Sequence, residues 1–232
     1  MLDAAGWEAL RLSLQVSLMA TLCTLPFAIW LAWVLARRDF PGKALVSALA
    51  HIPLVLPPVV TGYLLLIAFG RHGPLGQLFE TLFGLTFAFR WTGAALAAGI
   101  MAFPLMLRAI RLAVEAVDPR LEEAAATLGA SRPSVFFRLT LPLALPGVLV
   151  GVVMGFAKAM GEFGATITFV ANIPGETQTL PSAIYTLLQI PGKEGPAVQL
   201  ILWALAISLG AVLVSEWLAR RLARRIGASH AL

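Results

Sequence analysis

The chain has 232 residues, of which 59% are hydrophobic and 12% are charged, against about 25% charged in soluble domains. The mean hydropathy of +0.86 excludes a water-soluble globule and indicates a membrane protein. The net charge of +5 does not indicate nucleic-acid binding, because the basic residues stand at the ends of apolar segments and not on one face or in one tail.

Five apolar segments are long enough to cross a bilayer as helices, which takes about 20 residues. We predict spans at about 10–36, 44–70, 91–111, 142–165 and 195–219. Pro53, Pro57 and Pro58 interrupt the second and free backbone carbonyls that only protein or a wet cavity can satisfy. After Pro74, apolar residues at helical spacing predict a short interfacial helix. The predicted fold class is all-α, a single transmembrane domain over residues 1–232.

Lysine and arginine predict the orientation, since cytoplasmic loops are enriched in them. Twelve of the 17 follow the first span, lie at the end of the third span or between it and the fourth, or follow the fifth span. We therefore expect a multi-pass protein in contact with membrane lipid, with its N-terminus outside and its C-terminus in the cytoplasm. Arg108 and Arg111 are interpreted as side chains that reach back to the lipid headgroups.

The loop at residues 118–140 is the one soluble-looking helical insert in the chain. Asp118 can cap a helix, and Gly129 can supply the left-handed turn that ends it. Ser131 can cap a second short helix, and the pair Leu141 and Pro142 is expected to turn the chain towards the fourth span. The sequence therefore predicts a helix, a glycine turn and a helix on the cytoplasmic side.

The spacing in this loop resembles the EAA motif of ABC importer permeases: Glu-Ala-Ala, three residues, glycine, nine residues, an aliphatic residue, one residue and Leu-Pro. The matching residues are Glu123, Ala124, Ala125, Gly129, Leu139, Leu141 and Pro142, with leucine at 139 where isoleucine is commoner. The resemblance implies a coupling loop that docks on a separate ATPase subunit through Glu122, Glu123, Ala124, Ala125, Gly129, Ala130 and Ser131. An ordinary amphipathic surface helix is the alternative.

The sequence contains no phosphate-binding Gly-x-x-x-x-Gly-Lys-Ser/Thr loop, no His-Glu-x-x-His, no Gly-x-Ser-x-Gly and no cysteine pair. We therefore predict no catalytic residue, no metal and no cofactor on this chain. ATP and Mg would be bound by the partner ATPase. A membrane-embedded enzyme is the opposing hypothesis, and it would have only Lys158 and Glu162 as catalytic groups.

A polar stretch at the end of the fourth span supplies candidates for a translocation pathway, because ionisable groups in the membrane mark functional sites. The candidates are Lys158, Gly161, Glu162, Gly164, Thr166 and Thr168. The lysine and glutamate can equally neutralise each other at i, i+4. The glycines weaken the helix, and a broken helix exposes N–H groups that suit an anion, as do the two hydroxyls.

Gly147, Gly151 and Gly155 recur every four residues on the fourth span and predict a smooth face for helix packing. The spacing does not decide whether that contact lies within one subunit or between two. Because five helices are few for enclosing a pathway, we expect a two-fold homodimer around a central pore.

Three further stretches resemble the molybdate ABC transporter permeases: residues 161–177, HIPLVLPPVV at 51–60 and FPLMLRAIRL at 103–112. The resemblance covers nearly the whole chain, although the GEFGA element is similar in sulfate and tungstate permeases. It implies a homodimer in a bacterial cytoplasmic (inner) membrane, bound to two ATP-binding cassette subunits and supplied by a periplasmic or extracellular molybdate-binding protein.

Two alternatives to molybdate import stay open. One is a permease for sulfate, thiosulfate or tungstate, and the other is an ion-coupled carrier or channel acting alone. Because the sequence of the spans contains no dense cation cluster, we expect the binding protein to make most of the substrate discrimination.

Overall fold

The computed structural model describes residues 4–228, which fold into helices and connecting loops without a strand, so the all-α prediction is confirmed. The helices are α1 (Ala4–Arg37), α2 (Lys43–Val55), α3 (Pro58–Phe69), α4 (Pro74–Phe83), α5 (Trp91–Glu115), α6 (Pro119–Thr127), α7 (Arg132–Val135), the π-helix η1 (Phe136–Thr140), α8 (Leu141–Met160), α9 (Gly164–Val170), α10 (Leu180–Leu188) and α11 (Glu194–Ala228).

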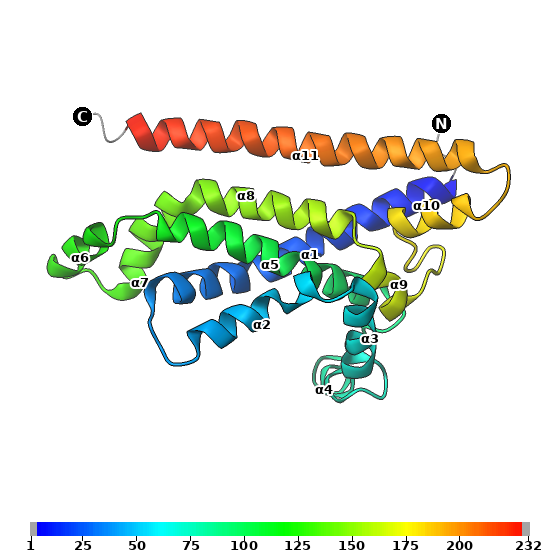
Figure 1. The fold of residues 1–232 in the computed structure, drawn as a ribbon, viewed down its shortest axis with the longest axis horizontal. Coiled ribbons are helices and arrows are strands. Elements are labelled where there is room, and N and C mark those ends of the chain that lie inside the picture. Colours follow the sequence, from blue (N-terminus) through cyan, green and yellow to red (C-terminus); the bar gives the residue numbers. More distant parts are fainter. Residues whose placement is uncertain (1–3, 229–232) are drawn as a thin grey trace.

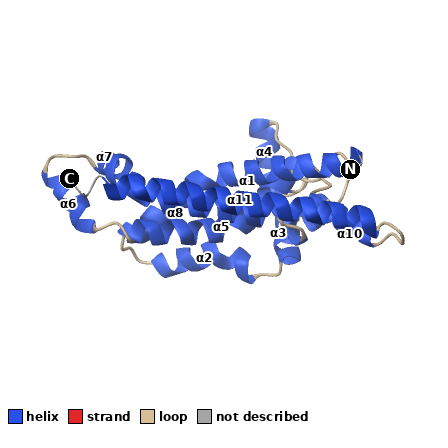
Figure 2. Cartoon of the chain, turned by 90° about the horizontal axis from the view of Figure 1, so that it is seen from above, coloured by secondary structure: helices blue, strands red, loops and turns tan. Residues whose placement is uncertain are grey.

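The long helices α1, α5, α8 and α11 run along the length of the molecule (Figure 1). The last residues of α1, the short helices α6 and α7 and the C-terminal end of α11 lie at one end. The helices α9 and α10 lie towards the other end, near the N-terminus, and α4 projects to one side beyond α3. The view from above in Figure 2 likewise has α10 and the N-terminus at the end opposite α6 and α7. The molecule therefore has two distinct ends, separated by membrane-length helices.

Four helices of the described part are long and apolar enough to cross a membrane: Ala4–Arg37, Trp91–Glu115, Arg132–Met160 and Glu194–Leu218. The helices α2 and α3 provide a fifth crossing if they are taken together, but their axes differ by 112°. The predicted second span is therefore bent and not straight. The bend lies where Leu56 is extended before Pro57 and Pro58, since a residue before proline is disfavoured in the helical region.

The structure differs from the sequence prediction at Leu141 and Pro142, because no turn separates the loop from the fourth span. The helix continues from Arg132 to Met160 through the π turn η1. Leu141 N–H donates to the carbonyl of Phe136, five residues earlier. This wider turn accommodates Pro142, which has no N–H to donate and whose ring would collide with the carbonyl four residues earlier in a regular helix.

The fourth span also ends earlier than the predicted 142–165, because α8 stops at Met160 and a separate helix, α9, begins at Gly164. Gly161 occupies the end of α8. The break therefore lies inside the polar stretch that the sequence singled out.

The core lies where α1, α5 and α8 pack together along most of their length. One side of α5 is lined with fully buried alanines, namely Ala94, Ala97, Ala98 and Ala102. Small side chains allow helix backbones to approach closely, which stabilises helix pairs where lipid removes the hydrophobic driving force. These three helices form the scaffold that carries the loop at one end and the polar break at the other.

Candidate functional site

The loop between α5 and α8 begins as its sequence predicts. The carboxylate of Asp118 accepts a hydrogen bond from Arg120 N–H at 2.9 Å and caps α6. Gly129 has a φ of +88°, the left-handed conformation that ends the helix, and Ala130 N–H donates back to Ala125 at 3.1 Å. Ser131 stands at the capping position of α7, but its side chain makes no capping hydrogen bond. That part of the prediction is wrong.

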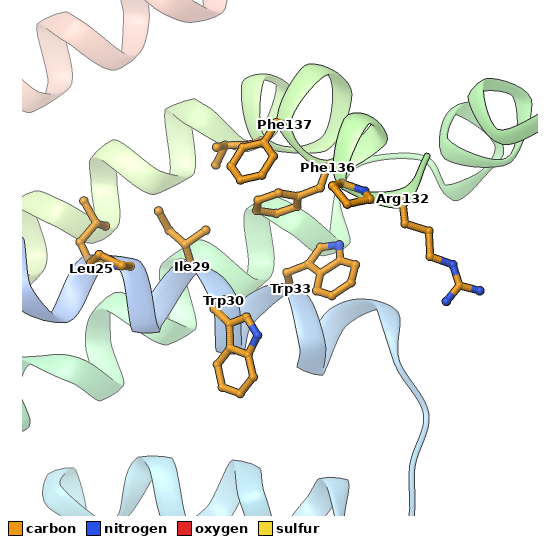
Figure 3. A pocket seen from close by; sticks show the side chains of 10 residues that line it. Leu25, Ile29, Trp30, Trp33, Arg132, Phe136 and Phe137 are labelled. Carbon is orange, nitrogen blue, oxygen red and sulfur yellow. The ribbon is translucent and has the colours of Figure 1, made fainter. Parts of the chain in front are cut away.

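An apolar cavity of about 540 Å³ lies beneath the loop, between α1 and the segment α7–η1 (Figure 3). Its aromatic lining includes Trp30, Trp33, Phe136 and Phe137, and Phe136 packs edge-on against Trp33 with ring centroids 5.7 Å apart. Arg132 is the one charged residue of the lining, and its side chain extends away from the rings. The cavity fits apolar chains and does not fit an oxyanion.

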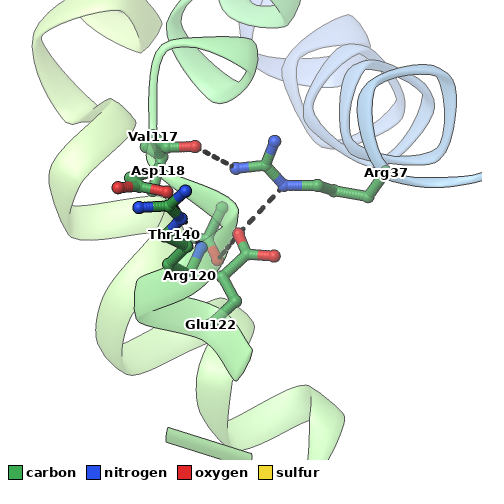
Figure 4. Close-up of polar contacts among 6 residues, drawn as sticks. All are labelled: Arg37, Val117, Asp118, Arg120, Glu122 and Thr140. Carbon is green, nitrogen blue, oxygen red and sulfur yellow. Dashed lines mark hydrogen bonds and ion pairs between the residues drawn. The ribbon is translucent and has the colours of Figure 1, made fainter. Parts of the chain in front are cut away.

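The carboxylate of Glu122 is the centre of a polar contact that joins α1, α6 and η1 (Figure 4). Its Oε1 accepts hydrogen bonds from Arg37 Nε at 3.0 Å and from Thr140 Oγ1 at 2.7 Å. Arg37 also donates through Nη2 to the carbonyl of Val117 at 2.7 Å. The side chains of Arg37 and Glu122 are only 12% and 19% exposed. Sequence reasoning did not assign either partner, because Arg37 lies on α1, far from the motif in sequence, and Thr140 stands inside the motif at a position that its spacing leaves unspecified.

The outer face of α6 is exposed, in contrast to the Glu122 side. Glu123 and Ala124 are exposed, and Leu128 is 88% exposed. A partner that covered Leu128 would therefore bury a large and almost fully accessible apolar side chain. The arrangement can therefore present a small apolar and acidic face to a partner while Glu122 holds the helix in place.

The polar stretch between α8 and α9 contains an ion pair whose glutamate is buried and whose lysine is partly exposed. Lys158 Nζ lies 2.6 Å from Glu162 Oε2, and the Glu162 side chain is 1% exposed. The other carboxylate oxygen, Oε1, accepts from Ala165 N–H at 3.0 Å. Lys158 therefore neutralises Glu162. The Glu162 carboxylate also binds an N–H group at the start of α9, where the sequence analysis expected an anion to bind.

The two threonines of this stretch bond within their own helix. Thr166 Oγ1 donates to the carbonyl of Phe163 at 2.9 Å, and Thr168 Oγ1 donates to that of Gly164 at 2.8 Å. Gly164 packs against Pro58 of α3, and Thr168 lies beside Gly62 of the same helix. The stretch is thus fastened to the bent helix pair, while its role in translocation stays a prediction.

The three glycines of α8 face α5 of the same chain. A Cβ on Gly151 would lie 2.9 Å from Ile110 Cγ1 and 3.3 Å from the carbonyl oxygen of Met106. Gly147 meets Ala113, and Gly155 meets Met106. The sequence left open whether this glycine face packs within one subunit or between two. In the structure it packs against α5 of the same subunit. No group of three histidine, cysteine, aspartate or glutamate side chains within residues 4–228 could hold a metal ion.

A family model described as "Binding-protein-dependent transport system inner membrane component" matches residues 24–226. The chain is 59% identical over 221 residues to the molybdenum transport system permease protein ModB of Escherichia coli (strain K12), covering 95% of this chain and 96% of that protein. It is 55% identical over 220 residues to ModB of Haemophilus influenzae, with 95% and 96% covered. It is 38% identical over 174 residues to the sulfate transport system permease protein CysW of Synechococcus elongatus, with 75% and 60% covered.

Solved structures share the fold at low sequence identity. A chain in the crystal structure of a bacterial ABC transporter involved in the import of the acidic polysaccharide alginate superimposes with a TM-score of 0.74 at 19% identity, covering 94% of this chain and 80% of that one. A chain of the inward-facing MetNI methionine ABC transporter gives a TM-score of 0.68 at 16% identity, with 94% of each chain covered. The chain therefore shares its overall fold with chains of solved ABC transporters.

Proposed function

The chain belongs to the family of binding-protein-dependent transport system inner membrane components, and we propose that it is the membrane-spanning subunit of an ATP-driven molybdate importer. The observation that carries the proposal is the 59% identity to a molybdenum transport permease over 95% of the chain. The exposed face of α6 supports it, because an importer subunit needs a docking surface for its ATPase.

We infer an assembly of two copies of this chain, two ATP-binding cassette subunits and a periplasmic or extracellular molybdate-binding protein. A related structure is described as an alginate ABC transporter in complex with a pentasaccharide-bound periplasmic protein, which supports such an arrangement. ATP and Mg belong to the cassette subunits, since the sequence of this chain has no phosphate loop. The chain itself is therefore a permease and not an enzyme.

The transport cycle would proceed by alternating access, with no chemical change in the substrate. ATP closes the cassette pair, and the two α6 helices move with it through the contact face around Glu123 and Ala124. Glu122 passes that displacement to α1 through Arg37 and to the start of α8 through Thr140. The spans then change from inward-facing to outward-facing, and hydrolysis returns them.

The proposed orientation places the N-terminus outside and the C-terminus in the cytoplasm of a bacterial inner membrane. The excess of basic residues at one set of helix ends supports it. The end of α1, the helix α6 and the C-terminal end of α11 share one end of the molecule, as a common cytoplasmic side requires (Figure 1).

A sulfate, thiosulfate or tungstate permease is the second candidate, favoured by the 38% identity to a sulfate transport permease. An ion-coupled carrier or channel acting alone would leave the exposed Leu128 and its neighbours on α6 without a partner. The stronger and longer match to molybdenum permeases favours molybdate.

The deciding experiment is ATP hydrolysis by this chain reconstituted in vesicles with its ATPase, with purified binding protein loaded with molybdate or with sulfate. We expect stimulation by the molybdate-loaded binding protein and none by the sulfate-loaded one. Stimulation by the sulfate-loaded protein alone would support an ABC importer of the same architecture whose substrate is sulfate and not molybdate. Failure of the ATPase to associate would overturn the docking role of the loop.

A further inference from the structure

The apolar cavity beneath the coupling loop borders a polar one. The polar cavity, of about 360 Å³, lies between the end of α1, α6 and the segment α7–η1. It shares Trp33, Arg132 and Phe136 with the apolar cavity of about 540 Å³. We call the two cavities together the amphipathic pocket. A ligand that fills it must have an apolar part and a polar part.

The apolar half of the pocket has the depth of one lipid leaflet. Its lining on α1 extends from Leu25 to Trp33, inside the uncharged run that ends before Arg37. At 1.5 Å per residue, Leu25 lies about 18 Å along α1 from Arg37, close to half of the roughly 30 Å hydrocarbon thickness. Two other lining residues, Trp30 and Phe137, are 62% and 63% exposed, so the cavity is open at the surface of the span. An acyl chain can therefore enter it sideways from the bilayer.

The polar half places positive charge at the end of the apolar lining. Its charged residues carry a net charge of +1 and are Arg37, Arg38, Arg132, Glu122 and Glu123. Arg37 pairs with Glu122 at 3.0 Å. Arg38 and Arg132, in contrast, have no ion pair or side-chain hydrogen bond within residues 4–228. The Arg38 guanidinium lies over the Trp33 ring, 5.4 Å from its centroid. Because guanidinium groups bind phosphate oxygens through paired N–H donors, this half suits an anionic headgroup.

We propose that the amphipathic pocket binds an anionic phospholipid, with one acyl chain in the apolar cavity and the headgroup phosphate at Arg38 and Arg132. A segment of the ATPase would reach only the polar half from water, whereas a phospholipid fills both halves. The lipid would bridge the end of α1 and the segment α7–η1, which Glu122 also joins. Assignment to the cytoplasmic leaflet rests on the proposed function, but the shape and charge of the pocket do not.

The headgroup contact can be tested with the permease, alone and in complex with its ATPase, reconstituted in equal amounts of phosphatidylglycerol and phosphatidylcholine. Native mass spectrometry after extraction measures the retained lipids, and we expect enrichment of phosphatidylglycerol. Arg38→Gln and Arg132→Gln should each lower the enrichment about 5-fold, the contribution of one arginine near an anionic membrane surface. Arg138→Gln is the matched control, since Arg138 is an exposed arginine on η1 that lines neither cavity. It should leave the enrichment unchanged.

The acyl chain can be located with phosphatidylglycerol that carries a photoactivatable diazirine on one chain. We expect cross-links concentrated on residues 25–33 and 136–141, and about 5-fold fewer of them in Arg132→Gln. The exposed apolar residues of α11 between 201 and 213 report ordinary lipid contact, and their labelling should not change in this variant. Equal labelling of both regions, no enrichment of phosphatidylglycerol, or an equal loss in Arg138→Gln would each show general lipid or charge contact and overturn the proposal.

Other occupants and the proposed function are distinguished by the same measurements. Lipid retained by the permease alone but lost from the permease–ATPase complex would assign the pocket to the ATPase and overturn the lipid site. The lipid experiments use no molybdate, binding protein or ATP. Enrichment with the expected losses but without molybdate-stimulated ATP hydrolysis would therefore support the lipid site and refute the importer as proposed. Stimulated hydrolysis without enrichment would refute the lipid site and leave the importer in place.

Discussion

At the scale of single residues, the adjacent acids Glu122 and Glu123 have opposite environments. Glu122 is mostly buried and accepts hydrogen bonds from Arg37 and Thr140, whereas Glu123 is exposed. We predict that Glu122→Gln lowers the free energy of unfolding by about 1–3 kcal/mol, because the largely buried Arg37 loses a charged partner. Thermal unfolding of the purified permease measures this loss, and stimulated ATP hydrolysis should fall with it.

Asp39→Asn is the matched control for the Glu122 variant. Asp39 also pairs with a cation, Lys43, whose hydrogen bond and charge hold the pKa of the Asp39 carboxyl below its usual range. The Asp39 side chain is fully accessible to water, so its pair should contribute nothing measurable to unfolding. Equal destabilisation by both variants would contradict the special role of Glu122.

The sequence identifies the acids of the coupling loop but not which of them faces inward. A one-residue difference on a helix changes the direction of a side chain by about 100°, and the motif spacing alone does not contain the position of Arg37. The buried pairing partner comes from α1, far away in the chain. Such contacts are decided by tertiary packing, which a single sequence does not display.

At the scale of helices, the contact of α8 with α5 depends on the absence of side chains along one face. We predict that Gly151→Leu destabilises the protein by about 1–3 kcal/mol or prevents folding, because even a Cβ there would press on Ile110 and the Met106 carbonyl. The measurement is the amount of correctly folded permease in the membrane and its melting temperature.

Gly210→Leu on α11 is the control for this steric effect, because a Cβ at Gly210 meets no atom within 4 Å in the described chain. It should leave the stability of the isolated subunit unchanged. A stable and active Gly151→Leu variant would show that α8 and α5 can separate without loss of the fold.

Helix existence and approximate span positions follow from the sequence, because uncharged runs of membrane length leave the backbone few alternatives to a helix. The 112° bend between α2 and α3 and the uninterrupted passage through Pro142 do not follow from it. Proline predicts a disturbance in both cases. Whether the chain bends sharply or absorbs the proline in a π turn depends on the neighbouring helices that pack against it.

At the scale of the whole molecule, the exposed face of α6 is the surface that the proposed function assigns to the ATPase. We predict that Leu128→Asp abolishes co-purification of the ATPase while membrane insertion stays normal, because it puts a charge into an apolar contact. Leu85→Asp, at an exposed leucine of the opposite end, is the control and should retain the ATPase. Native mass spectrometry of the retained complex should give two permeases and two ATPases.

The hydrogen bonds of Glu122 have a mechanical consequence for the transport cycle. They connect the C-terminal end of α1 and the N-terminal end of α8 to α6, and Arg37 also donates to the carbonyl of Val117, just beyond α5. A displacement of α6 should therefore move α1, α5 and α8 together. The sharp bend between α2 and α3 lies outside these contacts, so we expect the two halves of the bent pair to move relative to each other there during transport.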